Sequence, residues 1–227
     1  MDFIIISVGN ELLSGDIVNT NSAYIANKLT RSGHNVIKML TIPDVVDVIA
    51  QEVVDASQKA DHVIVTGGLG VTHDDVTAEG VAKATNRELK VNDEVFSFLR
   101  ARMKNETAIK SMATIPEGSE VVNNVVGAAP GFMVDNISVM PGVPEEMKYI
   151  LDKFLPKYGS YNYFEERMVV KGHEDKIMER LNSVVDEFED VEIGSYPKPG
   201  YIMIKFSGKD EKRVKAAKEK LEDLIKQ

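Results

Sequence analysis

The alternation of apolar and polar stretches along the first 70 residues predicts strands that alternate with helices. Compact apolar runs at residues 3–8, 35–42 and 62–66 are typical of buried strands. Residues 19–32 and 45–60, which separate these runs, have the apolar spacing and flanking residues of helices. Strands and helices in this order form parallel β-α-β units, so the pattern predicts a mostly parallel sheet covered on both faces.

The pattern continues through the middle of the chain with more helices and one hairpin. These elements are predicted at residues 78–85 (helix), 93–104 (helix), 131–140 (hairpin) and 141–155 (a turn followed by a helix). The hairpin turns at Asp135-Asn136, two residue types that tolerate turn conformations. Residues 105–131 are dense in Asn, Gly and Pro, and they predict no regular element. Together these segments predict a main α/β domain over residues 1–160.

A change in pattern follows the Gly- and Tyr-rich joint at residues 156–164. The order beyond it is strand, helix, strand, strand, helix, at residues 166–172, 175–188, 191–196, 201–208 and 211–226. Five elements in this order are enough to form a domain of their own. We therefore predict a small α+β domain over residues 165–227.

Composition narrows the class of protein. The chain has 227 residues, of which 43% are hydrophobic and 28% charged, as in ordinary globular proteins. Its net charge of -9 argues against nucleic acid as a partner, because Lys and Arg provide most contacts to phosphates. The absence of cysteine excludes disulfides, thiolate metal sites and cysteine catalysis. With no signal peptide and no apolar run near the ~20 residues of a membrane helix, we expect a cytoplasmic protein without a membrane partner.

The loop "TGGLGVTHDD" at residues 66–75 is the first candidate site, since it directly follows a predicted buried strand. Ligands of open α/β sheets bind outside the carboxyl ends of the strands. Gly67, Gly68 and Gly70 allow the backbone to approach a ligand, and exposed N–H groups suit an anion. The loop lacks both the Lys-Ser/Thr pair of a P-loop and the third glycine of the dinucleotide fingerprint. It therefore predicts a phosphate site of another kind.

Acidic residues follow all three strands. Asp74 and Asp75 end the glycine loop, Asp44 follows the second strand and Glu11 follows the first. These acids would repel a phosphate unless a cation lay between them. Carboxylates of this kind suit Mg²⁺ or Mn²⁺, which can bridge phosphate oxygens. The pattern therefore predicts a divalent metal beside the phosphate.

Structural roles compete with these functional ones. Asp75 or Thr77 can cap the following helix. Asp44 can serve as an acid at a helix N-terminus, where the helix dipole favours it. The segment "PGVPEE" is either a second anion site or a structural turn, because Glu145 and Glu146 already satisfy the dipole of the helix they begin.

Four segments together resemble a known family. In chain order they are "GNELLSGDIVNTN", "TGGLGVTHDDVTAE", "NNVVGAAPGF" and "MPGVPEEM". They resemble the signatures of the N-terminal domain of the competence/damage-inducible protein CinA, which belongs to the MoaB/Mog molybdopterin-binding superfamily. The match spans about residues 3–150. The resemblance implies a three-layer α/β/α fold, a nucleotide- or pterin-type phosphate ligand, and dependence on a divalent metal.

The resemblance also implies roles for individual residues. Asp75 matches the functional acid after the glycine loop in Mog-like proteins, and Asp44 matches the other carboxylate implicated there. CinA N-terminal domains are associated with ADP-ribose pyrophosphatase activity. We therefore predict an ADP-ribose hydrolase with Asp75 and Asp44 as catalytic residues and with Mg²⁺, Mn²⁺ or Co²⁺ at Asp74 and Asp75. The predicted substrate-binding residues are Asn10, Glu11, Gly67, Gly68, Gly70 and Thr72.

Two other functions remain open. One is molybdopterin binding or adenylyl transfer in cofactor synthesis, and the other is a non-catalytic nucleotide-binding module. Asp74-Asp75 is the CinA arrangement, whereas Mog-like proteins usually have Arg-Asp, which favours the hydrolase. The chain departs from the family pattern at Val71 (usually Pro) and Ala128 (usually Thr). Because the chain ends at Gln227, before the amidase domain of CinA, nicotinamide-nucleotide deamidation is not expected.

A homo-oligomer, most simply a dimer, is the expected assembly. A domain of ~60 residues hides only about 60% of its surface, so the C-terminal domain should need cover from a neighbour or from the main domain. The relatives that this chain resembles are also oligomeric. The remaining expected partner is a small substrate that contains phosphate, either a nucleotide sugar or a pterin.

Overall fold

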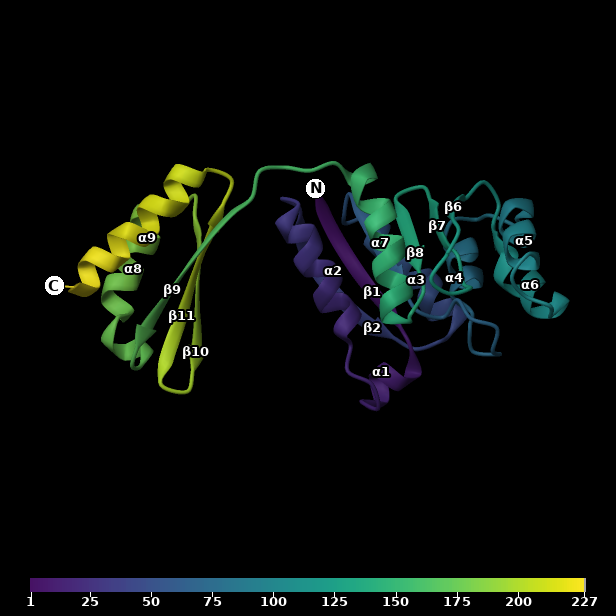
Figure 1. Ribbon diagram of the computed structural model, residues 1–227, viewed down its shortest axis with the longest axis horizontal. Coiled ribbons are helices and arrows are strands. Elements are labelled where there is room, and N and C mark those ends of the chain that lie inside the picture. Colours follow the sequence, from purple (N-terminus) through teal and green to yellow (C-terminus); the bar gives the residue numbers. More distant parts are fainter. Residues whose placement is uncertain (227) are drawn as a thin grey trace. The chain divides into compact units, whose positions relative to one another are not determined.

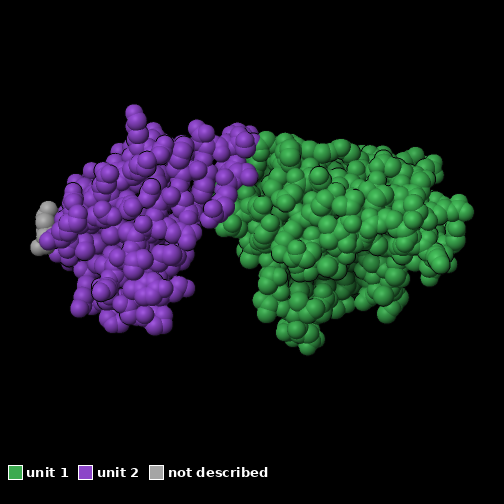
Figure 2. Space-filling model, in the orientation of Figure 1, with its two compact units in different colours: residues 1–30, 34–159 green, residues 31–33, 160–227 purple. Residues whose placement is uncertain are grey.

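The computed structural model describes residues 1–226 and divides them into two compact units (Figure 1). Figure 2 shows the two units in different colours. The first comprises residues 1–30 and 34–159, and the second comprises residues 31–33 and the chain from Ser160 onward. The main division therefore follows Gly159, where the sequence suggested a joint at residues 156–164.

A six-stranded sheet forms the centre of the first unit. Its strands lie in the order β2-β1-β3-β8-β7-β6. Their bounds are Asn35–Ile42 (β2), Asp2–Val8 (β1), His62–Thr66 (β3), Ile137–Met140 (β8), Gly131–Val134 (β7) and Glu120–Val122 (β6). The first four strands pair in parallel, and β7 pairs antiparallel with both of its neighbours. The predicted mostly parallel sheet and the β7–β8 hairpin are confirmed.

Helices cover both faces of this sheet. Side chains alternate between the faces of a strand, so neighbouring residues of β1 join different cores. Ile5 packs in one core with α2 (Thr20–Arg31) and α7 (Pro144–Tyr158). Ile6 packs in the other with α3 (Val46–Ser57), α4 (Thr77–Ala84), α5 (Asp93–Arg100) and α6 (Glu106–Ala113). The predicted three-layer arrangement is confirmed. Across residues 1–226, no helix is both long and apolar enough to cross a membrane.

Residues 89–131 contain more regular structure than predicted. The helix predicted over 93–104 ends at Arg100, and a second helix, α6, begins at Glu106. The side chain of Asn105 accepts a hydrogen bond from the backbone N–H of Ala108, at 3.1 Å, and so caps this second helix. Strand β6 and the small sheet of β4 (Leu89–Val91) and β5 (Thr114–Pro116) were also not predicted. These strands have only three residues each, too few for a periodic signal.

The second unit contains a three-stranded antiparallel sheet in the order β10-β11-β9. The strands are Phe164–Lys171 (β9), Glu192–Lys198 (β10) and Tyr201–Gly208 (β11). The helices are α8 (Met178–Glu187) and α9 (Glu211–Lys226), with a short 3₁₀ turn, η1 (Glu174–Lys176), before α8. Ile204 and Phe206 of β11 form a core with Val184 of α8 and Leu221 of α9. The predicted strand-helix-strand-strand-helix order is confirmed.

A buried histidine makes the stability of the first unit dependent on pH. His62 begins β3 and is 6% exposed, with its Nε2 atom 2.8 Å from the Ser138 hydroxyl. The Tyr158 hydroxyl donates to the same Ser138 oxygen, also at 2.8 Å. Burial lowers the pKa of His62 from 6.5 to about 4. In the native protein this imidazole is therefore neutral at neutral pH.

The unfolded chain should bind a proton at His62 below pH 6.5, whereas the native protein should resist it until about pH 4. The resulting stability is present in full above pH 6.5 and is lost as pH falls toward 4. This difference in pKa between the unfolded and native states corresponds to roughly 3 kcal/mol in the free energy of unfolding. We expect the free energy of unfolding of His62→Gln, measured by urea titration, to fall less steeply over this range than that of the wild type. Replacement of the exposed His73 by glutamine is the control, and an unchanged slope in His62→Gln would contradict the prediction.

Candidate functional site

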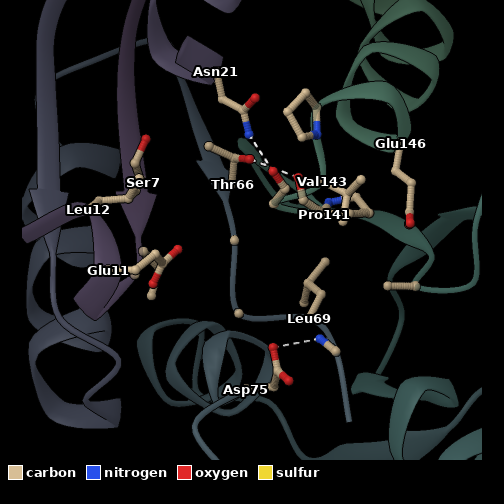
Figure 3. A pocket seen from close by; sticks show the side chains of 18 of the residues that line it. Ser7, Glu11, Leu12, Asn21, Thr66, Leu69, Asp75, Pro141, Val143 and Glu146 are labelled. Carbon is tan, nitrogen blue, oxygen red and sulfur yellow. Dashed lines mark hydrogen bonds between the residues drawn. The ribbon is translucent and has the colours of Figure 1, made fainter. Parts of the chain in front are cut away.

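A pocket of about 620 Å³ lies at the carboxyl ends of β1 and β3 (Figure 3). Its walls come from the end of β1 with the following helix α1 (Asn10–Ser14), from the glycine loop after β3, and from residues 141–146 after β8. Ends of parallel strands meet at one edge of a sheet, which explains why segments far apart in sequence share the pocket. Residues 10–14, directly after β1, form the short helix α1.

Two glycines place the loop backbone where side chains would not fit. Gly67 has φ +106°, and a Cβ atom there would lie 2.1 Å from the carbonyl oxygen of Val8 at the end of β1. Gly68 has φ +64°, and its Cβ atom would lie 2.3 Å from the Thr77 hydroxyl. The Gly67 N–H donates to the carbonyl oxygen of Met140, at 3.1 Å, which joins the loop to the end of β8. The glycines are thus required by close packing at the pocket floor.

Asp75 fixes the shape of the glycine loop. Its Oδ1 atom accepts from the Gly70 N–H at 2.7 Å, and its Oδ2 atom accepts from the Thr72 N–H at 2.8 Å and from the Thr72 hydroxyl at 2.5 Å. The N-cap of α4 is Val76, and no side chain accepts a hydrogen bond there. The capping role considered for Asp75 and Thr77 is therefore wrong. Asp75 instead closes the loop on itself from inside the pocket.

Asp44 joins two of the loops that form the pocket. Its Oδ2 atom accepts from the Asn10 N–H at 2.7 Å, which ties the start of α1 to the segment after β2. Asp44 directly precedes Val45, the N-cap of α3, so the helix dipole also favours an acid at this position. Burial raises the pKa of the Asp44 carboxyl, and the nearby carboxylates of Glu11, Asp74 and Asp75 raise it further, while the Asn10 N–H opposes the rise. This edge of the pocket has an excess of negative charge.

The structure brings the predicted site residues to one edge of the sheet. The predicted residues that line the pocket are Glu11, Asp44, Gly67, Gly68, Gly70, Asp74 and Asp75. Asn10 and Thr72 do not line it, although each was predicted to contact substrate. They act on it through hydrogen bonds, Asn10 to Asp44 and Thr72 to Asp75. Their predicted contact with substrate stays a prediction.

The acids do not form a complete metal site by themselves. Within residues 1–226, no three His, Asp or Glu side chains are grouped so as to hold a metal ion. Mg²⁺ in enzymes is commonly held by one or two carboxylates together with phosphate oxygens of the substrate. Of the two predicted ligands, Asp74 lines this edge with its side chain exposed, so it would hold a cation that arrives with a phosphate. The two oxygens of Asp75 already accept three hydrogen bonds, which reduces its capacity as a ligand.

Sequence reasoning missed the opposite wall of the pocket. Asn21 donates from Nδ2 to the Gly142 carbonyl oxygen at 2.7 Å, and Glu146 extends from the first turn of α7 into the cavity (Figure 3). The "PGVPEE" segment, which contains Glu146, indicated that a site was possible here. Its acids were also explained by the dipole of the helix they begin, so Glu146 was not predicted to line the pocket. Apolar side chains complete the lining at Leu12, Ile17, Val18, Leu69, Val71, Met103, Met112 and Val143.

The fold and the site define an α/β/α domain with a ligand pocket at the carboxyl edge of a mostly parallel sheet. The chain belongs to the family described as "probable molybdopterin binding domain", which matches residues 4–159. Residues 162–227 match the middle domain of FAD synthase. The two matches meet where the structure divides into its two units.

Individual relatives include CinA proteins. A protein of Archaeoglobus fulgidus is 58% identical over 99% of this chain and 98% of its own length. A CinA-like protein of Thermosipho melanesiensis is 34% identical over 98% of this chain and 59% of its own length. The crystal structure of CinA from Thermoplasma acidophilum, described there as of unknown function, has 34% identity and a TM-score of 0.66, covering 70% of this chain and 99% of that one. The resemblance to CinA found in the motifs is confirmed.

Proposed function

We propose that this protein hydrolyses the diphosphate bond of a nucleoside diphosphate sugar, preferably ADP-ribose, with the help of a divalent cation. The observation that supports the proposal is that the pocket combines a glycine loop with several acidic side chains and has no basic side chain in its lining. Among the residues that line the pocket there is no Lys or Arg, while Glu11, Asp44, Asp74, Asp75 and Glu146 are all acidic. A phosphate ligand would therefore need a cation beside it.

The glycine loop, Asp75 and Asp44 have separate roles in this reaction. The N–H groups of Gly67, Gly70 and Thr72 already donate within the protein, so the diphosphate would be bound by the other N–H groups of the glycine loop. Asp75 holds that loop in its binding conformation. A bound divalent cation would supply the positive charge that the phosphate oxygens lack among the side chains. Asp44, whose pKa is raised, is suited to accept a proton from the attacking water. The water oxygen bonds to one phosphorus, the bond from that phosphorus to the bridging oxygen breaks, and AMP and ribose phosphate leave.

The assay that tests this proposal is incubation with ADP-ribose and Mg²⁺, Mn²⁺ or Co²⁺, followed by chromatography of the products. We expect AMP and ribose phosphate in equal amounts, and none when a chelator removes the cation. An Asp44→Asn variant should bind ADP-ribose but turn it over at least about 100-fold more slowly, a typical loss for a general base. Ligand-dependent stabilisation without any product would contradict hydrolysis and favour a binding module.

The family description supports one alternative, in which the same pocket binds molybdopterin or transfers an adenylyl group to it. Formation of an adenylylated pterin from ATP, in place of ADP-ribose cleavage, would favour that function. The homo-dimer also stays a prediction. Light scattering at micromolar concentration should return about twice the chain mass of 25.1 kDa.

A further inference from the structure

Glu146 is a positioned carboxylate that the proposed reaction does not use. It is the third residue of α7 and lies on the side of the pocket away from Glu11 (Figure 3). An acid at this position of a helix commonly bonds back to the N-cap residue. In this protein the N-cap is Val143, and the Glu146 carboxylate turns instead toward the loop at residues 124–129.

A buried asparagine holds this carboxylate in place. Asn124 is 0% exposed, and its Nδ2 atom donates both to Oε2 of Glu146 at 2.5 Å and to the Ala129 carbonyl oxygen at 2.9 Å. Its Oδ1 atom accepts from the N–H groups of Val126 and Gly127, at 3.1 and 2.9 Å. The amide is thus fully used and cannot rotate without losing hydrogen bonds in a buried site.

Close packing holds the carboxylate from a second side. A Cβ atom on Gly127 would lie 2.1 Å from the carboxyl carbon of Glu146, so only glycine leaves room for the carboxylate in this position. Among the described residues, Asn124 is the one group that donates a hydrogen bond to Glu146, and the Oε1 atom accepts none. A fixed, partly buried acceptor with unused lone pairs therefore faces the pocket.

The neighbouring acid has none of these properties. Glu145 is exposed, its Oε1 atom lies 2.6 Å from Nζ of Lys148, and it does not line the pocket. The two glutamates are consecutive on the same helical turn, so they experience the same helix dipole. Substitution of Glu145 therefore measures the effect of losing a charge at the start of α7. Any additional effect of substituting Glu146 reports its role in the pocket.

We propose that Glu146 is a specificity-determining residue that binds a pair of adjacent hydrogen-bond donors at the end of the ligand remote from its phosphates. A carboxylate accepts hydrogen bonds and repels phosphate, so the part of the ligand that reaches it must be a neutral donor group. Either the vicinal hydroxyls of a ribose or the N–H pair of a guanine-type ring has this chemistry. The inference rests on the proposed function only in placing the phosphates at the glycine loop.

The decisive variant is Glu146→Gln, with Glu145→Gln as the matched control. Glutamine keeps the volume, and its carbonyl oxygen can still accept from Asn124, but its NH₂ group would meet a donor on the ligand. If the donors are ribose hydroxyls, we expect calorimetry with Mg²⁺ present to show affinity for ADP-ribose lowered by about 10- to 100-fold, as for a lost hydrogen bond to a charged group. If they belong to a guanine-type ring, the same loss should appear for GDP. Affinity for inorganic pyrophosphate, which carries no such donors, should stay within about twofold of wild type in both variants.

Two ligand pairs distinguish the two sources of donors. If a ribose diol contacts Glu146, wild type should prefer ADP to 2′,3′-dideoxy-ADP, and Glu146→Gln should lose that preference. If a guanine-type ring contacts Glu146, wild type should prefer GDP to IDP, because IDP lacks the amino group. Glu146→Gln should then lose that preference. Gly127→Ala, which displaces the carboxylate without changing charge, should reproduce the loss.

Discrimination within both ligand pairs that is the same in Glu146→Gln as in wild type and Glu145→Gln would overturn the proposal. Thermal melting of each variant shows whether the fold is retained. Should wild type bind ADP-ribose without cleaving it, the hydrolase would be refuted, and loss of discrimination in Glu146→Gln would still support the subsite. Hydrolysis that continues while Glu146→Gln keeps the wild-type discrimination within both ligand pairs would refute the subsite and leave the hydrolase standing.

Discussion

Replacement of Asp75 by asparagine should reduce metal-dependent turnover by at least about 100-fold, comparable to the loss of one preorganised electrostatic contact in an active site. The Asp75 carboxylate accepts hydrogen bonds on both oxygens, from the N–H groups of Gly70 and Thr72 and from the Thr72 hydroxyl. Asparagine has only one carbonyl oxygen, so its NH₂ group would face a backbone N–H. The loop would lose its closed form, and the negative charge would also be lost.

Comparison with Asp74→Asn separates these two effects. That substitution also removes a charge from the pocket edge, yet it leaves the three hydrogen bonds to Asp75 intact. Because Asp75→Asn removes hydrogen bonds that close the loop, we expect it to lower the free energy of unfolding more than Asp74→Asn does, as measured by urea titration. Steady-state kinetics with ADP-ribose then measures turnover in both variants. Hydrolysis by Asp75→Asn at the wild-type rate would show that loop closure by this carboxylate is dispensable.

Replacement of Gly67 by alanine should destabilise the first unit by roughly 3 kcal/mol or more, in the range of strained and overpacked buried sites. The added Cβ atom would lie 2.1 Å from the Val8 carbonyl oxygen, so the end of β1 or the loop must move. The φ angle of +106° is also one that side chains disfavour. Urea unfolding followed by circular dichroism measures the change in the free energy of unfolding.

Gly15→Ala is the matched control for this prediction. Gly15 has φ +81°, but a Cβ atom there would meet nothing within 4 Å. Its replacement should therefore cost only the strain of the left-handed conformation, about 1 kcal/mol. If the two variants lose equal stability, the contact with Val8 has no energetic weight and backbone strain alone explains the glycines.

Local patterns were sufficient to predict the main elements and to pick out seven residues that line one pocket, at Glu11, Asp44, Gly67, Gly68, Gly70, Asp74 and Asp75. Buried strands of the sheet appear as apolar runs, and the helices that cover them appear as periodic segments, because each element must bury a face of its own. The glycine loop and the acids Glu11, Asp44 and Asp75 were recognised because they follow strand ends, and parallel strands bring their carboxyl ends to the same edge. These features depend on the neighbours of each residue along the chain.

Local sequence patterns did not predict the regular elements within residues 105–131. Helix α6 depends on the cap from Asn105, and strand β6 depends on pairing with β7, so neither has a periodic signal long enough to detect. The antiparallel insertion of β7 into a parallel sheet likewise follows from its hairpin with β8. These elements are stabilised by partners rather than by their own composition.

The roles of the polar residues were decided by tertiary structure. Asp75 has the sequence position of a helix cap but bonds to its own loop, and Glu146 has the position of a helix N-terminal acid but bonds to Asn124, 22 residues away. A polar side chain can satisfy itself with any suitable partner in reach, and the partners in reach are set by chain packing. Hydrophobic periodicity is a local property that the sequence displays directly, whereas hydrogen-bond partners are chosen only when distant segments come together.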